Sequence, residues 1–177
     1  MRKLLTLIAA LSIAAAASAQ TVEGTFVQTK TIKASGKSFV SKGNLSYTAP
    51  DQLSMIFSDP DGDYLIIDGP YLRSDLGGTA MDVDTSRNTQ MRNLKNTLLN
   101  CIAGNVETVA AENNADLVTK NKSGGGRTVT LTAKKAAARG YSRIVIEYRA
   151  DGLMTYMLLE EFGGVSTEMK ISNIKKR

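Results

Sequence analysis

The chain is 177 residues long, carries 22 Lys and Arg against 17 Asp and Glu, and contains no His and no Trp. The lack of His excludes Ser-His-Asp and Cys-His catalytic arrangements and the usual His-bearing zinc sites, which weighs against an enzyme. The formal net charge of +5 is modest, and no group of basic residues is dense enough to indicate a nucleic-acid partner. The composition therefore favours a binding protein with no catalytic site, no metal and no other cofactor.

The first 19 residues have the pattern of a secretory signal peptide. Arg2 and Lys3 precede an apolar run at residues 4–17, and residues 17–19 are Ala-Ser-Ala, a small-x-small cleavage site. The apolar run is too short to span a membrane. We therefore expect an exported protein of one domain, residues 20–177. Its net charge is +3, because the signal peptide holds two of the basic residues and none of the acidic ones.

Alternation of apolar and polar residues with a period of two predicts strands through the first part of the mature chain. Pro, Asp and Gly separate the runs, as they do at tight connections between antiparallel strands. We expect strands at residues 22–33, 38–48, 52–58, 64–67 and from 72–74 onward. Residues 81–84 also alternate, but this run is too short to assign.

The middle of the chain changes to helical spacing. Apolar residues at residues 87–102 recur with the period of an amphipathic helix of about four turns, with Ser86 as its N-cap and Gly104 at its end. Residues 106–115 predict either a second, weaker helix or the beginning of a strand. The only cysteine, Cys101, has no partner for an internal disulfide, and its helical apolar surroundings predict a buried side chain rather than a reactive thiol.

The last third of the chain returns to strand patterns. We expect strands at residues 116–120, 127–133, 142–149, 153–162 and 166–174, with a Gly-rich hairpin loop at 121–126 and a polar connection at 134–140. The whole chain then has about nine to eleven strands and one or two helices. A sheet that long must curl, because strand twist accumulates and open edges are a liability. The fold class is therefore mainly β with helices (α+β): one mostly antiparallel sheet, curled into a partial barrel, with the helix on its concave face.

Three local motifs resemble functional sites, but we interpret each as a structural feature. Residues 59–63 are rich in Asp, but the EF-hand position that requires Gly falls on Tyr64, so we predict a turn between strands. Residues 123–127 are Gly-rich but lack the Gly-Lys-Ser/Thr ending of a phosphate loop. Glu160 and Glu161 resemble a glycosidase pair only in composition, because neighbouring strand residues point to opposite faces; we interpret them as solvated charge at a sheet edge.

The apolar face of the first strands has two interpretations, a plain core or a cavity for an apolar ligand. Large, flexible side chains dominate it, and Met in particular suits surfaces that take varied apolar partners. The strands supply Leu45, Tyr47, Leu53, Met55, Phe57 and Leu65, and the facing helix supplies Met91, Leu94 and Leu98.

Several short motifs together resemble the LolA-type outer-membrane lipoprotein carrier family over most of residues 24–174. No single motif is specific, and the resemblance lies in their order and spacing. The motifs are Phe26-Val27-Gln28, Gly43-Asn44-Leu45-x-Tyr47, Pro50-x-x-Leu53-x-Met55, Pro60 followed by Leu65-Ile66-Ile67-Asp68-Gly69-x-x-Leu72, Asp151-Gly152-Leu153, and Gly164-x-x-Thr167 before Ile171-x-Asn173.

The resemblance implies an unclosed, strongly curved antiparallel half-barrel with a helical lid, in a monomeric periplasmic carrier that is not an enzyme. Such a carrier accepts acylated lipoproteins from an inner-membrane lipoprotein-releasing ABC transporter, shields their acyl chains, and delivers them to an outer-membrane lipoprotein receptor. The alternative is a lipid- or glycolipid-binding sensor or shuttle on the same fold. The predicted lipid-binding set consists of Phe26, Leu45, Tyr47, Leu53, Met55, Phe57, Leu65, Met91, Leu94 and Leu98.

Within that set, the grounds differ. Leu53 and Met55 match positions where the family has large apolar cavity residues, whereas Phe26 extends the set by strand parity. One position departs from the family pattern: Ala49 stands where the family has an Arg that ties the lid shut. The family's helix before the Phe-x-Gln strand is also almost missing, since only residues 20–25 precede that strand after the expected cleavage. These departures do not support the family's closing mechanism here, and we expect a divergent carrier that is open more often.

Overall fold

The computed structural model describes residues 20–135 and 140–177. The predicted signal peptide, residues 1–19, lies outside the described residues, and so does most of the predicted connection at 134–140. The described part of the chain contains eleven strands, two α-helices and one short 3-10 helix. Within it, no helix has the length and apolarity needed to cross a membrane.

All eleven strands join one antiparallel sheet in the order β6-β5-β4-β3-β2-β1-β11-β10-β9-β8-β7, so the first and last strands are neighbours in its middle. The edge strands β6 and β7 do not pair, and the sheet stays open. This arrangement confirms the predicted fold class. The strands are β1 (Thr21–Ile32), β2 (Lys37–Thr48), β3 (Gln52–Asp59), β4 (Asp61–Asp68), β5 (Tyr71–Leu76), β6 (Thr79–Asp84), β7 (Ala115–Asn121), β8 (Arg127–Ala133), β9 (Tyr141–Tyr148), β10 (Met154–Glu161) and β11 (Val165–Lys176).

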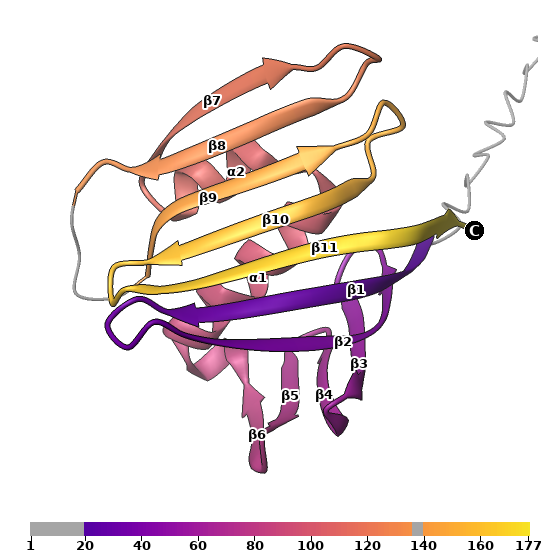
Figure 1. Ribbon diagram of the computed structural model, residues 1–177, viewed down its shortest axis with the longest axis vertical. Helices are drawn as coiled ribbons and strands as arrows, with labels where there is room; N and C mark the ends of the chain where they lie inside the picture. Colours follow the sequence, from indigo (N-terminus) through magenta and orange to yellow (C-terminus); the bar gives the residue numbers. More distant parts are fainter. Residues whose placement is uncertain (1–19, 136–139) are drawn as a thin grey trace, which may run out of the picture.

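The sheet bends sharply between β2 and β3. In Figure 1, β7 to β11, β1 and β2 run side by side, whereas β3 to β6 run steeply across them. The register slips at this bend: Lys42 pairs with Asp59 and Gly43 with Phe57, which leaves Ser58 as an extra residue. A side chain on Gly43 could not fit, because a Cβ there would lie 2.1 Å from the carbonyl oxygen of Ile56. Bulges of this kind increase local twist and bend the strand.

The predicted long helix is confirmed as α1 (Thr89–Ala103), preceded by η1 (Thr85–Arg87). Its predicted cap was wrong. The side-chain oxygen of Asn88 accepts a hydrogen bond from the Met91 backbone N–H, whereas Ser86 donates to the carboxylate of Asp84 within η1. Because the Ser86 hydroxyl is bonded to Asp84, it does not cap α1, and α1 begins one short turn later, at Thr89. Gly104 ends the helix as predicted, with φ of 83° in the left-handed region.

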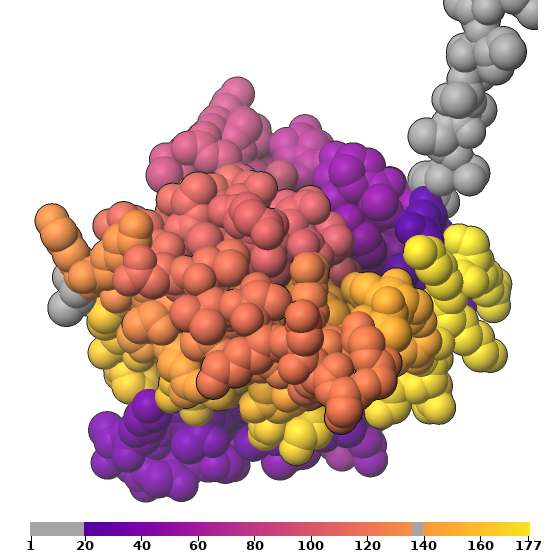
Figure 2. Space-filling view, turned by 90° about the horizontal axis from the view of Figure 1, so that it is seen from above, coloured from indigo at the N-terminus to yellow at the C-terminus, as the bar shows by residue number. Residues whose placement is uncertain are grey.

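Residues 106–115 contain both structures that the pattern allowed. Helix α2 (Val106–Glu112) comes first, and strand β7 begins at Ala115. Both helices lie on the concave face of the sheet (Figure 1). Figure 2, the view from above, shows α2, β7 and β8 forming a close-packed surface over this end of the molecule. Four core side chains there are at most 1% exposed: Val106, Val109, Val129 and Ile146.

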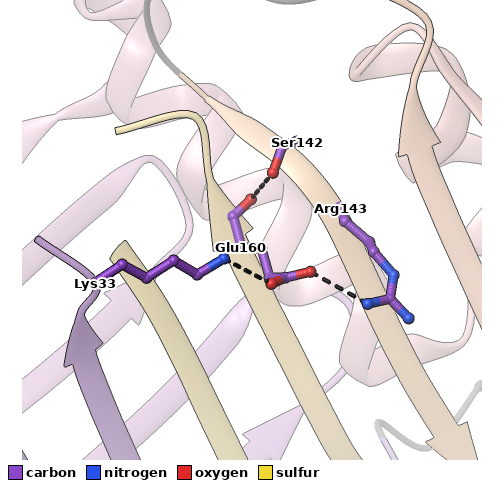
Figure 3. A network of polar contacts seen from close by, with 4 residues as sticks. All are labelled: Lys33, Ser142, Arg143 and Glu160. Carbon is purple, nitrogen blue, oxygen red and sulfur yellow. Dashed lines mark hydrogen bonds and ion pairs between the residues drawn. The ribbon is translucent and has the colours of Figure 1, made fainter. Parts of the chain in front are cut away.

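Glu160 corrects another prediction, because it is not at a sheet edge. Strand β10 lies between β9 and β11 in the interior of the sheet. The Glu160 carboxylate accepts hydrogen bonds from Lys33 Nζ at 3.1 Å and from Arg143 at 3.2 Å, and its backbone carbonyl accepts one from the Ser142 hydroxyl at 3.0 Å (Figure 3). The hydrogen bond from Lys33, with the positive charges of Lys33 and Arg143, lowers the pKa of Glu160 against the opposing effect of partial burial. The predicted separation of the two glutamates holds, since Glu161 lies on the opposite, concave face.

Candidate functional site: an apolar cavity beneath α1

A cavity of about 200 Å³ lies between α1 and the concave face of the sheet. The sheet contributes its floor from both halves of the chain, and α1 contributes its roof. The lining residues are Gln28, Lys30, Met55, Phe57, Leu65, Leu76, Leu94, Thr97, Leu98, Tyr141, Met157, Leu159, Glu161, Thr167 and Met169.

Most of the cavity surface is apolar and adaptable. Met55, Met157 and Met169 bring three thioether side chains to the floor from β3, β10 and β11. Methionine is unbranched and polarizable, so it fits irregular apolar ligands without a fixed shape. Leu94 and Leu98, one helical turn apart on α1, close the cavity from above. This lining suits a flexible hydrocarbon better than a rigid polar metabolite.

Apart from the buried Thr97 on α1, four polar lining residues lie at one end of the cavity. Lys30 and Thr167 face each other across the β1–β11 pair, near the turns that end β1 and begin β11. Glu161 is the last residue of β10, and Gln28 lies two residues before Lys30. Because Lys30 and Glu161 are exposed to solvent, this polar end marks where the cavity meets water.

The volume limits what the cavity holds as it stands. Small-molecule sites in proteins usually enclose roughly 300–1,000 Å³, whereas this cavity measures about 200 Å³. It can therefore take part of one hydrocarbon chain. A larger apolar ligand requires the roof to move away from the floor.

The structure divides the predicted lipid-binding set. Met55, Phe57, Leu65, Leu94 and Leu98 line the cavity. Phe26, Leu45, Tyr47 and Leu53 are buried in the core and at most 5% exposed. Phe26 supports the cavity from beneath, since its ring meets that of Phe57 edge-on with centroids 5.0 Å apart. Met91 is half-buried on α1 and does not belong to the lining.

Sequence reasoning missed the part of the floor that comes from the last third of the chain. Tyr141, Met157, Leu159 and Met169 line the cavity from β9, β10 and β11. The alternation that predicts these strands already places Met157 and Leu159 on one face. Their position opposite β3 follows from the curvature of the sheet, which sequence alternation does not reveal.

Two side chains, the buried Tyr148 and the half-buried Arg127, hold the C-terminal end of α1. The Tyr148 hydroxyl donates a 2.6 Å hydrogen bond to the Cys101 carbonyl, and Arg127 donates one of 3.4 Å to the Gly104 carbonyl. The Arg127 guanidinium also lies 4.9 Å from the centre of the Tyr148 ring, a favourable cation–π contact. Burial raises the pKa of Tyr148, so its hydroxyl stays protonated at neutral pH and remains a hydrogen-bond donor.

The N-terminal half of α1 has a lighter connection. Lys95 Nζ donates a 2.8 Å hydrogen bond to the Gly69 carbonyl in the turn between β4 and β5. This bond crosses from the helix to the sheet on the side where Ala49 replaces the Arg expected from the family pattern. The structure thus supplies a different polar contact between helix and sheet.

Cys101 is fully buried, as predicted, and burial raises the pKa of its thiol to about 12. The side chain therefore stays protonated and packs as a small apolar group. Within residues 20–135 and 140–177, no cluster of three or more His, Cys, Asp or Glu could hold a metal ion.

A second hollow, on the convex face, measures about 430 Å³ and has a mixed lining, in which Leu45 and Ile56 lie among polar and charged residues. It lies over β1, β2, β3 and β11, where Asn44, Ser46 and Ser54 point away from the core. It is larger than the cavity beneath α1 but more open to solvent, so it would leave a bound acyl chain in contact with water. The cavity beneath α1 is the better candidate site.

Comparisons with known proteins place the chain in a family. A DUF1329 family protein from Desulfovibrio piger is 16% identical, with 90% of this chain and 86% of that chain covered and a TM-score of 0.45. A putative outer membrane lipoprotein-sorting protein domain from Vibrio parahaemolyticus is 12% identical, with coverages of 90% and 86% and a TM-score of 0.42. The lipoprotein LppX of Mycobacterium tuberculosis is 11% identical, with coverages of 86% and 85% and a TM-score of 0.37. No curated protein matches the chain.

The family model "Outer membrane lipoprotein carrier protein LolA" matches residues 17–177. The chain belongs to the LolA family. This confirms the resemblance inferred from the ordered motifs, and the match spans every residue that lines the cavity. LolA-family proteins are periplasmic carriers with a binding fold, and an apolar cavity beneath a helix is consistent with lipid binding in general.

Proposed function

We propose that this LolA-family protein carries lipoproteins across the periplasm by holding their acyl chains in the cavity beneath α1. The observation that carries the proposal is an apolar, methionine-rich cavity whose roof, Leu94 and Leu98, is a single helix. The physical need is large: each buried methylene is worth about 0.8 kcal/mol, so a chain of about 15 methylenes costs on the order of 12 kcal/mol to expose to water.

Loading requires α1 to lift at its N-terminal half. The cavity of about 200 Å³ is too small for a whole acyl chain. In this movement the C-terminal end of α1 stays attached through Tyr148 and Arg127, while the hydrogen bond from Lys95 to the Gly69 carbonyl breaks. Hinged movement of this kind opens a site without unfolding the protein.

In the cell, the carrier accepts acylated lipoproteins from an inner-membrane ABC transporter and delivers them to an outer-membrane receptor, acting as a monomer. The proposed signal peptide, residues 1–19, directs export. Cell fractionation and N-terminal sequencing of the mature protein test this step, with a periplasmic chain that begins at Gln20 as the expected result. A cytoplasmic chain that keeps Met1 would contradict it.

The decisive test is native mass spectrometry of the mature protein purified from the periplasm. We expect a bound acylated lipoprotein, and we expect Leu94→Glu to abolish binding because it puts a carboxylate into the roof. Met91→Glu is the matched control, since Met91 is on the same helix and half-buried but outside the cavity lining. Binding that survives Leu94→Glu would contradict the site. A bound glycolipid in place of lipoprotein would favour the sensor or shuttle alternative.

A further inference from the structure

The end of the β1–β2 hairpin, residues 30–42, combines exposed apolar side chains with unopposed positive charge. It contains Lys30, Lys33, Lys37 and Lys42 and no Asp or Glu. In the same segment Phe39 is 54% exposed and Val40 is 63% exposed. These two side chains add exposed apolar area to a segment whose only charges are positive.

Phe39 and Val40 point to opposite faces of the hairpin. Phe39 pairs with Lys30, on the concave face, whereas Val40 pairs with Thr29, on the convex face. A protein that docks flat against one face of the sheet would cover one of these side chains and leave the other in water. Insertion of the hairpin end into the headgroup region of a membrane would cover both side chains at once.

The backbone geometry leaves this end free. Strand β3 pairs with β2 only from Lys42 onward, so residues 37–41 pair with β1 on one side and have no strand on the other. Two of the lysines have ion pairs, Lys33 with Glu160 and Lys42 with Asp59. Among the residues that the structure describes, the side chains of Lys30 and Lys37 have no ion pair and remain available for an anion.

The hairpin end lies beside the polar end of the cavity. Lys30 belongs to both, and the Lys33 backbone N–H donates a 2.9 Å hydrogen bond to the Gly164 carbonyl in the β10–β11 turn. The carboxylates near this end include Glu161, which lines the cavity, and three with basic partners: Glu160 with Lys33 and Arg143, Asp59 with Lys42, and Glu168 with Lys170. A surface that accepts the hairpin end therefore also meets the cavity where it opens to water.

We propose that the hairpin end docks directly on an anionic phospholipid surface. Phe39 and Val40 enter the headgroup region, Lys30 and Lys37 contact lipid phosphates, and the polar end of the cavity faces the bilayer. Apolar side chains with flanking lysines bind such surfaces by adding buried area to electrostatic attraction. This binding is separate from cargo binding beneath α1 and does not need a protein receptor.

Co-sedimentation of the mature protein with vesicles tests the proposal. We expect binding to phosphatidylglycerol–phosphatidylcholine vesicles, weaker binding at high salt, and little binding to phosphatidylcholine alone. Lys30→Gln with Lys37→Gln should weaken binding roughly 25-fold, at about fivefold per lysine. Phe39→Ser with Val40→Ser should weaken it by at least about tenfold. Circular dichroism should stay unchanged in both double variants. Lipoprotein binding should stay unchanged in Lys37→Gln alone and in Phe39→Ser with Val40→Ser, because none of these three residues lines the cavity.

The controls use equally exposed residues at the far edge of the sheet. Val118→Ser, 53% exposed on β7, and Lys120→Gln on the same strand should bind vesicles like the parent. The Leu94→Glu variant should also bind vesicles, which separates this proposal from the carrier function. Equal binding to both kinds of vesicle, or equal losses in the control variants, overturns the proposal. A third result also overturns the proposal: the parent protein binds no vesicles, yet the hairpin variants lose lipoprotein transfer. That result would favour a protein partner at the hairpin end.

Discussion

The two ends of α1 are held in different ways. At its C-terminal end, α1 and α2 pack against β8 and β9, where Val109 and Ile146 are fully buried, and Tyr148 binds the helix carbonyl of Cys101. At its N-terminal half, α1 lies over a cavity, and Lys95 donates a hydrogen bond to the Gly69 carbonyl in the turn between β4 and β5. One helix thus has an anchored end and a releasable end. This difference indicates that a ligand enters beneath the N-terminal half of α1, because that half lies over the cavity and not against β8 and β9.

The largest effect on stability should come from a substitution at the bend between β2 and β3. Gly43→Ala would place a Cβ 2.1 Å from the Ile56 carbonyl oxygen, so β3 must separate from β2. We expect a loss of more than about 3 kcal/mol in the free energy of unfolding, measured by urea denaturation. Gly163→Ala is the control, since a Cβ there meets nothing within 4 Å. A Gly43→Ala protein of parental stability would show that the bend does not depend on this close contact.

Weakening the anchored end should cost less. Tyr148→Phe leaves the buried Cys101 carbonyl without its 2.6 Å hydrogen bond, which should lower the free energy of unfolding by about 1–3 kcal/mol. Hydrogen exchange should then speed up in the last turn of α1 and in α2. Faster exchange confined to the first turns of α1 would mean that the two ends have been assigned the wrong way round.

Releasing the other end should change exchange of cargo more than stability. Lys95→Met removes the bond to the Gly69 carbonyl and keeps most of the apolar stem, so we expect a loss of about 0.5–1 kcal/mol. The rates of acyl-chain uptake and release, followed with a fluorescent fatty acyl peptide, should rise severalfold. Unchanged rates in Lys95→Met would remove this bond from the opening step.

The smallest effect should come from the polar network on the convex face. The pKa of Glu160 is lowered in the folded protein, chiefly by the hydrogen bond from Lys33, so its contribution is present at neutral pH and is lost as the pH falls through that lowered pKa. Glu160→Gln should therefore cost about 0.5–1 kcal/mol at pH 7 and much less at pH 3. Denaturation at both pH values measures this difference. An equal cost at both would mean that packing, not charge, is what Glu160 provides.

The sequence predicts the fold well because its signals are local. Strand alternation and helical spacing each need only neighbouring residues, and Gly104 ends α1 as its residue type suggests. The Ser86 prediction failed because Asp84, two residues away, is a stronger acceptor for the same hydroxyl. Strand β6 was not assigned from the sequence, because its alternating pattern is short and two of its six residues are Asp82 and Asp84.

The site is harder to predict because it joins distant parts of the chain. Alternation places Met55 and Leu53 on the same face, yet the structure puts Met55 in the cavity and Leu53 in the core. The curvature of the sheet decides between them, and it also brings Met157 across from β3. The bond from Tyr148 to α1 spans 47 residues and has no local signature.

The most direct test of the carrier account is site-specific crosslinking. A photo-crosslinking amino acid placed at Leu94, in the cavity roof, should form a covalent product with the acyl chain of a bound lipoprotein. The same group placed at Ile56, 47% exposed on the opposite face of the sheet, should form none. Equal products from both positions, or a product from Ile56 alone, would contradict the claim that acyl chains bind beneath α1.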